Sequence, residues 1–265
     1  MSISQLTAVF SPSDEISRSL LTVHLAGPEA LMIDFGLPFG ALDTLLNVVP
    51  AKTWSDLLPI AHDLTAELLA PAVTPAGGHG GLLAAPPPAE TEALTPAHVT
   101  ALLTTAREGH DRIVMDISAA WRASQITALS LADCIAFVVR ADIPGLVTGQ
   151  RCLALLKHLG LRERVRLVVA ATPPPMAVSH AEIADLLGPI HAVLPWDPAA
   201  VIRTRNLGEP RLGTGPMRQA LADIALGWEP APGVSGQPVG ASTVWQRTGY
   251  RLRGLMAKTV TVRPV

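Results

Sequence analysis

A short turn near the start of the chain holds the residues whose types and spacing could do chemistry. It runs from Ser13 to Ser19 and reads Ser-Asp-Glu-Ile-Ser-Arg-Ser. An apolar run at 6–10 precedes it, a helical pattern covers 14–26, and a second apolar run ends at Asp34. A strand, a turn with a helix, and a parallel strand ending in a carboxylate form the frame of sites that bind nucleotide phosphates. The chemistry to consider is therefore binding of a nucleoside triphosphate.

The turn lacks the residues that a phosphate-binding loop uses. Such a loop needs glycines so that backbone N–H groups can surround the phosphates, a lysine that reaches the β and γ oxygens, and a hydroxyl for Mg²⁺. No glycine precedes Gly27, and the lysines all lie elsewhere: Lys52, Lys157 and Lys258. Asp14 and Glu15 place two carboxylates where a triphosphate would bring about four negative charges, and close like charges cost on the order of kcal/mol each. The sequence therefore predicts a degenerate site.

Four residues remain as candidates for residual nucleotide contacts: Arg18, Ser19, Asp34 and Asp116. Asp116, like Asp34, ends a strand that looks buried, and ligands of parallel α/β sheets sit beyond the carboxyl ends of strands. The two carboxylates could hold Mg²⁺ or simply cap the turns that follow. Arg18 could replace the loop lysine, although its planar fork differs from a compact ammonium. Alternatively, Arg18 is an ordinary exposed helix residue.

The elements that must position these residues alternate between strands and helices. From residue 95 onward, the pattern predicts helices at 95–108, 121–130, 144–159, 179–187 and 217–226, and strands at 112–116, 134–139, 165–170 and 191–194. Before residue 95, it predicts a short helix ending at Leu46, helices at 54–58 and 60–69, and a short strand within 81–86. This alternation predicts an α/β fold with a mostly parallel sheet and helices on both faces.

Length and composition limit the class of protein. The 265 residues allow an α/β domain of about 230 residues, 1–228, followed by a tail. No apolar run reaches the roughly 18–20 residues of a membrane span, and the start resembles no export signal, so we expect a cytoplasmic protein.

Cys134 and Cys152 lack metal-ligand spacing, and the eight histidines form no ligand pair on one helix. We therefore expect no metal site and, without a Gly-x-Ser-x-Gly sequence, no serine-hydrolase chemistry.

The charge of the chain is unevenly distributed. The net charge is −2, but the residues after Glu229 carry five basic and no acidic side chains, which leaves −7 on the remainder. An acidic domain with only four Phe and one Tyr offers no platform for nucleic acid, so we expect none to bind.

The basic tail divides into two predicted parts. Residues 229–242 are rich in Pro and Gly and are expected to form a flexible linker. Residues 243–258, within the terminal segment 243–265, are predicted to form a basic amphipathic helix. Such a helix can lie on an anionic membrane, fit a partner, or pack back onto its own domain. The docking candidates are Val244, Trp245, Arg247, Arg251, Leu252, Arg253, Leu255, Met256 and Lys258.

Five blocks in order carry a family resemblance. After the first strand and the degenerate loop come LMIDFGLPFGAL at 31–42, GLLAAP at 81–86, HDRIVMD at 110–116, and LPWD at 194–197 followed by NLGEP at 206–210. In this order the chain resembles the ParA/MinD ATPases over roughly residues 5–228. Within them it is most similar to the TadZ/CpaE branch associated with Flp-type (Tad) pilus assembly. The resemblance implies a P-loop NTPase fold of the MinD type.

The departures from the family pattern fall on the nucleotide site. Where the family loop has two glycines, Val, Gly, Lys and two Thr, this chain has Asp14, Glu15, Ile16, Ser17, Arg18, Ser19 and Leu20. Ser13 stands where the family has an extra lysine, and Gly36 where it has a second carboxylate. The asparagine that meets the adenine corresponds to Ala170 or Ala171. Asp116 matches the Walker B carboxylate and is retained.

The resemblance and these departures together imply a pseudo-ATPase that binds ATP and Mg²⁺ weakly or not at all. We expect a localisation or assembly scaffold for a pilus or another cell-surface machine. Its expected partners are proteins of that machine, and a nucleotide-competent relative is one candidate. MinD-type proteins carry a C-terminal membrane-targeting helix, so peripheral attachment to the inner face of the membrane is also expected. Any homo- or hetero-dimer should form without nucleotide. The alternatives are an active ATPase with an atypical loop, and a chromosome-partitioning or division-site factor.

Overall fold

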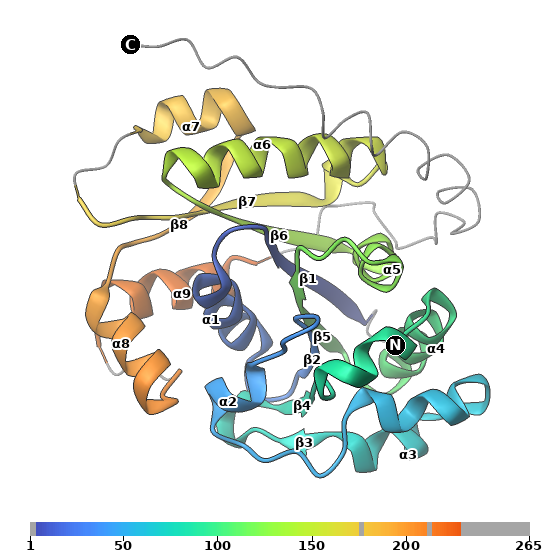
Figure 1. Ribbon diagram of the computed structural model, residues 1–265. Coiled ribbons are helices and arrows are strands. Elements are labelled where there is room, and N and C mark those ends of the chain that lie inside the picture. The colour runs from blue at the N-terminus through green and yellow to red at the C-terminus, as the bar shows by residue number, and fades with distance from the viewer. Residues whose placement is uncertain (1–3, 175–177, 211–213, 229–265) are drawn as a thin grey trace.

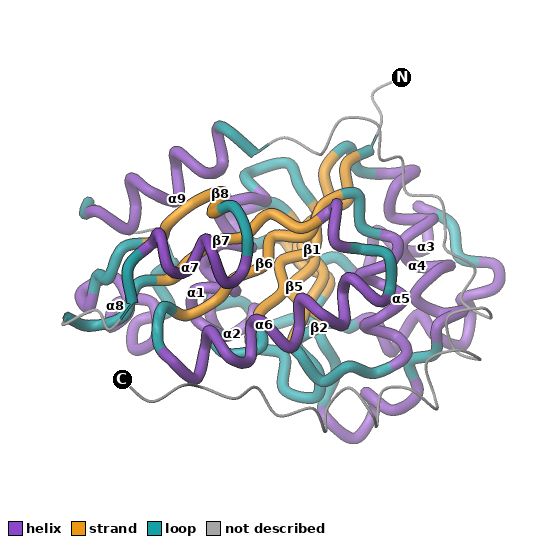
Figure 2. The backbone as a smooth tube through the Cα atoms, turned by 90° about the horizontal axis from the view of Figure 1, so that it is seen from above, coloured by secondary structure: helices purple, strands orange, loops and turns teal. Residues whose placement is uncertain are grey.

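The strands of the chain form a single layer with helices on either side (Figures 1 and 2). The computed structural model describes residues 4–174, 178–210 and 214–228. Within these residues, an eight-stranded sheet has the order β3-β4-β2-β5-β1-β6-β7-β8. All neighbouring strands are parallel except β3 and β4. The strands are β1 (Gln5–Ser11), β2 (Leu31–Phe35), β3 (Thr74–Pro75), β4 (Gly81–Leu83), β5 (Arg112–Ser118), β6 (Cys134–Arg140), β7 (Val165–Ala170) and β8 (Ile190–Leu194). The predicted α/β fold with a mostly parallel sheet is confirmed.

Two apolar layers hold the helices against the sheet, because successive side chains of a strand point to opposite faces. In β6, Phe137 belongs to one layer and Val138 to the other. The first layer packs against α4 (Pro96–Gly109), α5 (Ala123–Leu131), α6 (Ile143–His158) and α7 (His180–Leu187). The second packs against α1 (Glu15–Ala26), α2 (Leu42–Leu46), α8 (Pro198–Leu207) and α9 (Pro216–Leu226). Figure 1 shows α6 and α7 on one side of β7 and β8, with α1 and α9 on the other.

Several element boundaries differ from the sequence predictions. The helices predicted at 54–58 and 60–69 are a 3₁₀-helix, η1 (Trp54–Asp63), followed by α3 (Ala66–Leu69). Pro59 lies inside η1 and cannot donate a backbone hydrogen bond, which disfavours a regular α-helix there. The helix predicted from Trp121 begins at Ala123, because Trp121 itself has a left-handed φ of 53°. The remaining 3₁₀-helices are η2 (Ala70–Ala72), η3 (Gly77–His79), η4 (Pro88–Ala93) and η5 (Arg162–Arg164).

The described helices do not include one that is both long and apolar enough to cross a membrane. The predicted linker at 229–242 and the predicted basic helix at 243–258, with all nine docking candidates, lie outside the described residues.

Candidate functional site

The two predicted carboxylates lie side by side at the carboxyl end of the sheet. Asp34 on β2 is the register partner of Asp116 on β5, and Val9 on β1 is the next neighbour of Asp116. Each aspartate is only 1% exposed. Because β1 ends at Ser11 and α1 begins at Glu15, the first turn of α1 faces this pair across a very short connection.

Arg18 and Asp116 form a buried ion pair. The Arg18 Nε donates to Asp116 Oδ1, and Arg18 Nη2 lies 3.5 Å from Asp116 Oδ2. Ser19 Oγ donates to the same Oδ2 at 2.7 Å. Burial lowers the pKa of Arg18, but the charge and hydrogen bond of Asp116, together with the charges of Asp34 and Glu15, outweigh it, so that the pKa is raised overall. The interpretation of Arg18 as an exposed helix residue is wrong, since it is 5% exposed and neutralises Asp116.

Asp34 is held by the backbone that follows it. Its Oδ1 accepts from the Gly36 N–H at 2.8 Å and its Oδ2 from the Leu42 N–H at 3.0 Å. This is the capping arrangement that the sequence allowed. Burial, and then the charge of Asp116, raise the pKa of Asp34 to about 7, against the opposing effect of these bonds and of Arg18. The cluster thus contains two carboxyl groups and one guanidinium.

The segment after β2 closes tightly over Asp34. A Cβ atom at Gly40 would lie 2.4 Å from the Cβ of Ala85 and 2.7 Å from Asp34 Oδ2, so only glycine fits there. From the other side, Trp54 Nε1 donates to the carbonyl of Asp34 at 3.0 Å. The carboxyl group is therefore enclosed by its own chain.

Side chains of the turn before α1 accept hydrogen bonds from three of its own backbone N–H groups. Asp14 is the N-cap of α1, and its carboxylate accepts from the N–H of Ser17 at 3.0 Å and from the Ser17 hydroxyl at 2.8 Å. Ser11 Oγ accepts from the N–H groups of Ser13 and Asp14 at 3.2 and 2.9 Å. The carboxylate of Asp14 also occupies the positive end of the helix dipole. In a phosphate-binding loop, backbone N–H groups in these positions and the positive end of the helix dipole would face the nucleotide instead.

Two cavities flank this turn, and Asp14 lines both. One, of about 440 Å³, lies between the turn, the loop after β2 and the end of β5, and the exposed Phe39 lines it. The other, of about 280 Å³, lies between the start of α1 and the ends of β6, β7 and β8. Ala170 and Ala171 line the second cavity, where the resemblance places the missing asparagine. Neither alanine side chain can hydrogen-bond a base.

These residues do not fit a Mg²⁺-bound nucleoside triphosphate. Arg18 and Ser19 are both committed to Asp116, the Ser17 N–H of α1 is bonded to Asp14, and the Ser13 N–H of the turn is bonded to Ser11. The described residues also contain no group of three or more His, Cys, Asp or Glu placed to hold a metal ion. The arrangement is a closed polar cluster rather than an open phosphate cradle.

Sequence reasoning missed one residue that organises this end of the sheet. Gln125 on α5 is 1% exposed, and its Nε2 donates to the carbonyl of Phe35 at 3.0 Å and to Ser118 Oγ at 2.9 Å. Ser118 Oγ in turn donates to the carbonyl of Leu37 at 2.6 Å. A polar residue on the buried face of the predicted helix 121–130 was the available signal, because a buried amide needs partners.

The fold of the chain also occurs in solved structures of known proteins. No family model and no curated protein sequence matches the chain. Among solved structures, it is similar to a ParA family ATPase from Chlorobium tepidum TLS, with a TM-score of 0.77 and 20% identity over 85% of this chain and 100% of that one. It is similar to MinD of Pyrococcus horikoshii OT3 complexed with Mg-ADP, with a TM-score of 0.70 and 18% identity over 84% and 94%. It is also similar to a chain of the MinC:MinD cell division complex of Aquifex aeolicus, with a TM-score of 0.66 and 20% identity over 98% and 99%. The chain thus has the fold of the ParA and MinD ATPases.

Proposed function

We propose that the chain is a non-hydrolysing protein of the ParA/MinD fold that acts as a localisation or assembly scaffold. The buried ion pair between Arg18 and Asp116 carries this proposal. It joins the two residues that the resemblance aligns with the loop lysine and the Walker B carboxylate. A guanidinium bound to a carboxylate neutralises it, and neither group remains available for phosphate or Mg²⁺. The role in TadZ/CpaE-like pilus assembly rests on the sequence resemblance, and pilus ATPase and platform genes beside the gene would support it.

The proposal predicts that the protein does not bind Mg²⁺-ATP with micromolar affinity. A triphosphate at α1 would have to displace the Asp14 carboxylate from the Ser17 N–H and overcome its negative charge. We expect isothermal titration calorimetry with Mg²⁺-ATP and Mg²⁺-ADP to give no saturable heat, while a nucleotide-competent MinD gives it under the same conditions. Light scattering should show the same mass with and without ATP. Micromolar binding, or ATP turnover that Asp116→Ala abolishes, would instead favour an active ATPase with an atypical loop.

We further propose that the basic segment 243–258 attaches the protein to an anionic membrane. Each cation near such a surface contributes about 1 kcal/mol, and the apolar side chains add partial burial. Changing both Arg247 and Arg251 to Gln should therefore weaken binding to phosphatidylglycerol vesicles roughly 10- to 30-fold. Truncation after Gly240 should abolish it, while Arg263→Gln, outside the predicted helix, should change it less. Loss of the folded state on truncation would mean that the segment packs on its own domain, and salt-insensitive binding would contradict the charge contribution.

A second candidate function is positioning of a cargo or of the division site. The similar solved structures include MinD proteins and a plasmid partition protein of Borrelia burgdorferi B31, which favours this class over unrelated ones. A fluorescent fusion distinguishes the two candidates in cells. A scaffold without a nucleotide switch should form a static focus, whereas a partition or positioning ATPase should redistribute in a nucleotide-dependent manner.

A further inference from the structure

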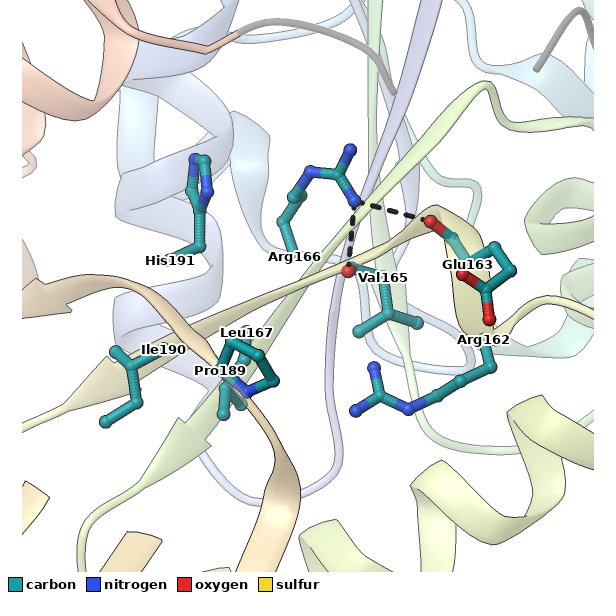
Figure 3. Close-up of a pocket in the computed structure, with 8 residues that line it drawn as sticks. All are labelled: Arg162, Glu163, Val165, Arg166, Leu167, Pro189, Ile190 and His191. Carbon is teal, nitrogen blue, oxygen red and sulfur yellow. Dashed lines mark hydrogen bonds between the residues drawn. The ribbon is translucent and has the colours of Figure 1, made fainter. Parts of the chain in front are cut away.

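The last strand of the sheet, β8, has one edge that no other described strand covers. Of the two ends of the sheet, β3 has only two residues, one of them Pro75, whereas β8 runs over the five residues Ile190–Leu194. Only Leu194 of β8 is buried, although all five residues of β2 are. A cavity of about 450 Å³ lies beside the amino end of β8 (Figure 3), so the described residues leave space there.

The backbone groups of Val193 face this open edge. The Leu194 carbonyl accepts from the Ala171 N–H at 2.8 Å, which points Leu194 toward β7. The N–H and C=O groups of successive strand residues point to opposite sides, so those of Val193 point away from β7. Neither group has a hydrogen-bond partner among the described residues. Unpaired backbone groups on an edge are a template for a further strand.

The side chains of β8 also favour pairing. None is charged, although natural edge strands commonly carry charges that prevent unwanted pairing. Ile190 and Val193 are half-buried against one apolar layer, Ala192 packs on the other, and His191 meets the ring of Trp228. Figure 3 shows the side chains of Ile190 and His191 pointing in opposite directions from β8. The bulge at His191 leaves the part from Ala192 onward in regular register with β7, so a partner strand can pair there.

A segment beyond the described residues has the pattern of such a partner. Residues 259–262 read Thr-Val-Thr-Val, and β-branched residues favour strands. In a strand, the two valines share one face and the two threonines the other. Lys258 and Arg263-Pro264 bound this segment, as Pro189 and Pro195 bound β8. The segment therefore matches β8 in length and in residue type.

The described part of the chain ends directly beside β8. Trp228, its last residue, is buried, and the centroids of its ring and the His191 ring are 5.2 Å apart. Residues 229–258, 30 in number, connect Trp228 to the Thr-Val-Thr-Val segment. A flexible chain of this length spans roughly 30 Å on average, which exceeds the roughly 17 Å length of a five-residue strand. The segment can therefore reach the open edge within the same molecule.

We propose that residues 259–262 pair with the open edge of β8 of the same molecule as a ninth strand of the sheet. Val260 and Val262 lie on the face of Val193, and the backbone of the added strand bonds the free N–H and C=O of Val193. Pairing also removes apolar side chains at the edge from water. The basic segment 243–258 is then held near the domain at both ends. The proposal depends on β8 alone and holds whether or not the protein binds nucleotide.

Amide hydrogen exchange of the full chain, followed by NMR, tests the pairing. Changing both Val260 and Val262 to Asp places two charges on the apolar face of the added strand. This double variant should exchange the Val193 N–H at least about tenfold faster than the unchanged protein, because the open edge exposes that group. The Leu194 N–H points toward β7 and should stay equally slow in both proteins, which also verifies that the sheet is folded.

A matched control makes the same changes elsewhere in the chain. Val234→Asp with Val239→Asp adds two charges within the predicted linker and should leave the exchange of Val193 unchanged. The proposal is wrong if Val193 exchanges at one rate in the unchanged protein and in the variant of Val260 and Val262. It is also wrong if the linker control accelerates Val193 to the same extent.

Crosslinking tests the face and the molecule independently. Paired residues of neighbouring strands have Cβ atoms roughly 4.5–5.5 Å apart, close to the reach of a disulfide. Val193→Cys combined with Val260→Cys or Val262→Cys should form an intramolecular disulfide on oxidation by copper phenanthroline, as seen by non-reducing electrophoresis. The combinations with Thr259→Cys and Thr261→Cys, on the other face, should react at least about tenfold more slowly. The two native cysteines are buried and do not compete. Equal reaction from both faces would rule out a paired strand, and a disulfide between two molecules would contradict pairing within one chain.

Discussion

Replacing Arg18 by methionine should lower the free energy of unfolding by about 3–5 kcal/mol at neutral pH, the range for breaking a buried ion pair by removing one partner. Methionine fills much of the same volume, so the loss comes mainly from charge rather than from a cavity. The Asp116 carboxylate would keep the hydroxyl of Ser19 as a partner but lose the guanidinium of Arg18. It would then face Asp34 across β2 and β5 without a neutralising charge.

A double-mutant cycle separates this charge effect from packing. Adding Asp116→Asn to Arg18→Met removes the unpaired charge of Asp116. The unfolding free energy of the double variant should therefore be at least about 2 kcal/mol higher than that of Arg18→Met alone. Urea unfolding followed by circular dichroism measures each free energy. Arg151→Met makes the same substitution at an exposed position of α6 and should change stability by no more than about 0.5 kcal/mol. Additive losses in the double variant would show that the ion pair contributes no coupling and would weaken the proposed function.

The sequence predicted the strands and the turn that form this site, because each of them depends on a local residue pattern. Apolar runs that end in Asp34 and Asp116 predicted two strands whose carboxyl ends carry acids, and α/β alternation predicted that these ends share one edge of the sheet. The glycine-free turn predicted a degenerate loop. The pairing of Arg18 with Asp116 was not predictable, because the two residues are 98 positions apart and depend on β5 lying between β2 and β1.

The elements that sequence reasoning missed have weak local signals. In α8, only Ala200 and Thr204 are buried, so no apolar stripe marks this helix. β3 has two residues, one of them Pro75, and proline is tolerated there because β3 is an edge strand. The pairing of β7 with β8 contains a bulge, which the apolar pattern of β8 does not reveal. Irregularities of this kind are fixed by packing between strands rather than by neighbouring residues.

The carboxyl cluster formed by Asp34 and Asp116 should bind a proton in the folded protein. Asp34 and Asp116 share a single guanidinium, and protonating one carboxyl balances the charge of the cluster. The raised pKa of Asp34, about 7, identifies it as the group that takes the proton, whereas an unfolded aspartate ionises near pH 4. Between these two values the folded protein binds more protons than the unfolded chain. Its stability must therefore fall as the pH rises through this window and level off above it.

We expect Asp34 to contribute a loss of on the order of 2–3 kcal/mol in unfolding free energy between pH 5 and pH 8. Asp34→Asn cannot ionise and should remove this slope. It should also carry a pH-independent cost of about 1–3 kcal/mol, because its NH₂ group would oppose the N–H of Gly36 or Leu42. The test therefore takes the difference in unfolding free energy between Asp34→Asn and the unchanged protein, at pH 8 and again at pH 5. The pH-independent cost is the same at both pH values, so it cancels when the second difference is subtracted from the first. Asp185→Asn, at an exposed position of α7, should leave the slope unchanged. If Asp34→Asn keeps the full slope, Asp34 is ionised throughout, and the cluster carries a net negative charge that Arg18 alone must stabilise.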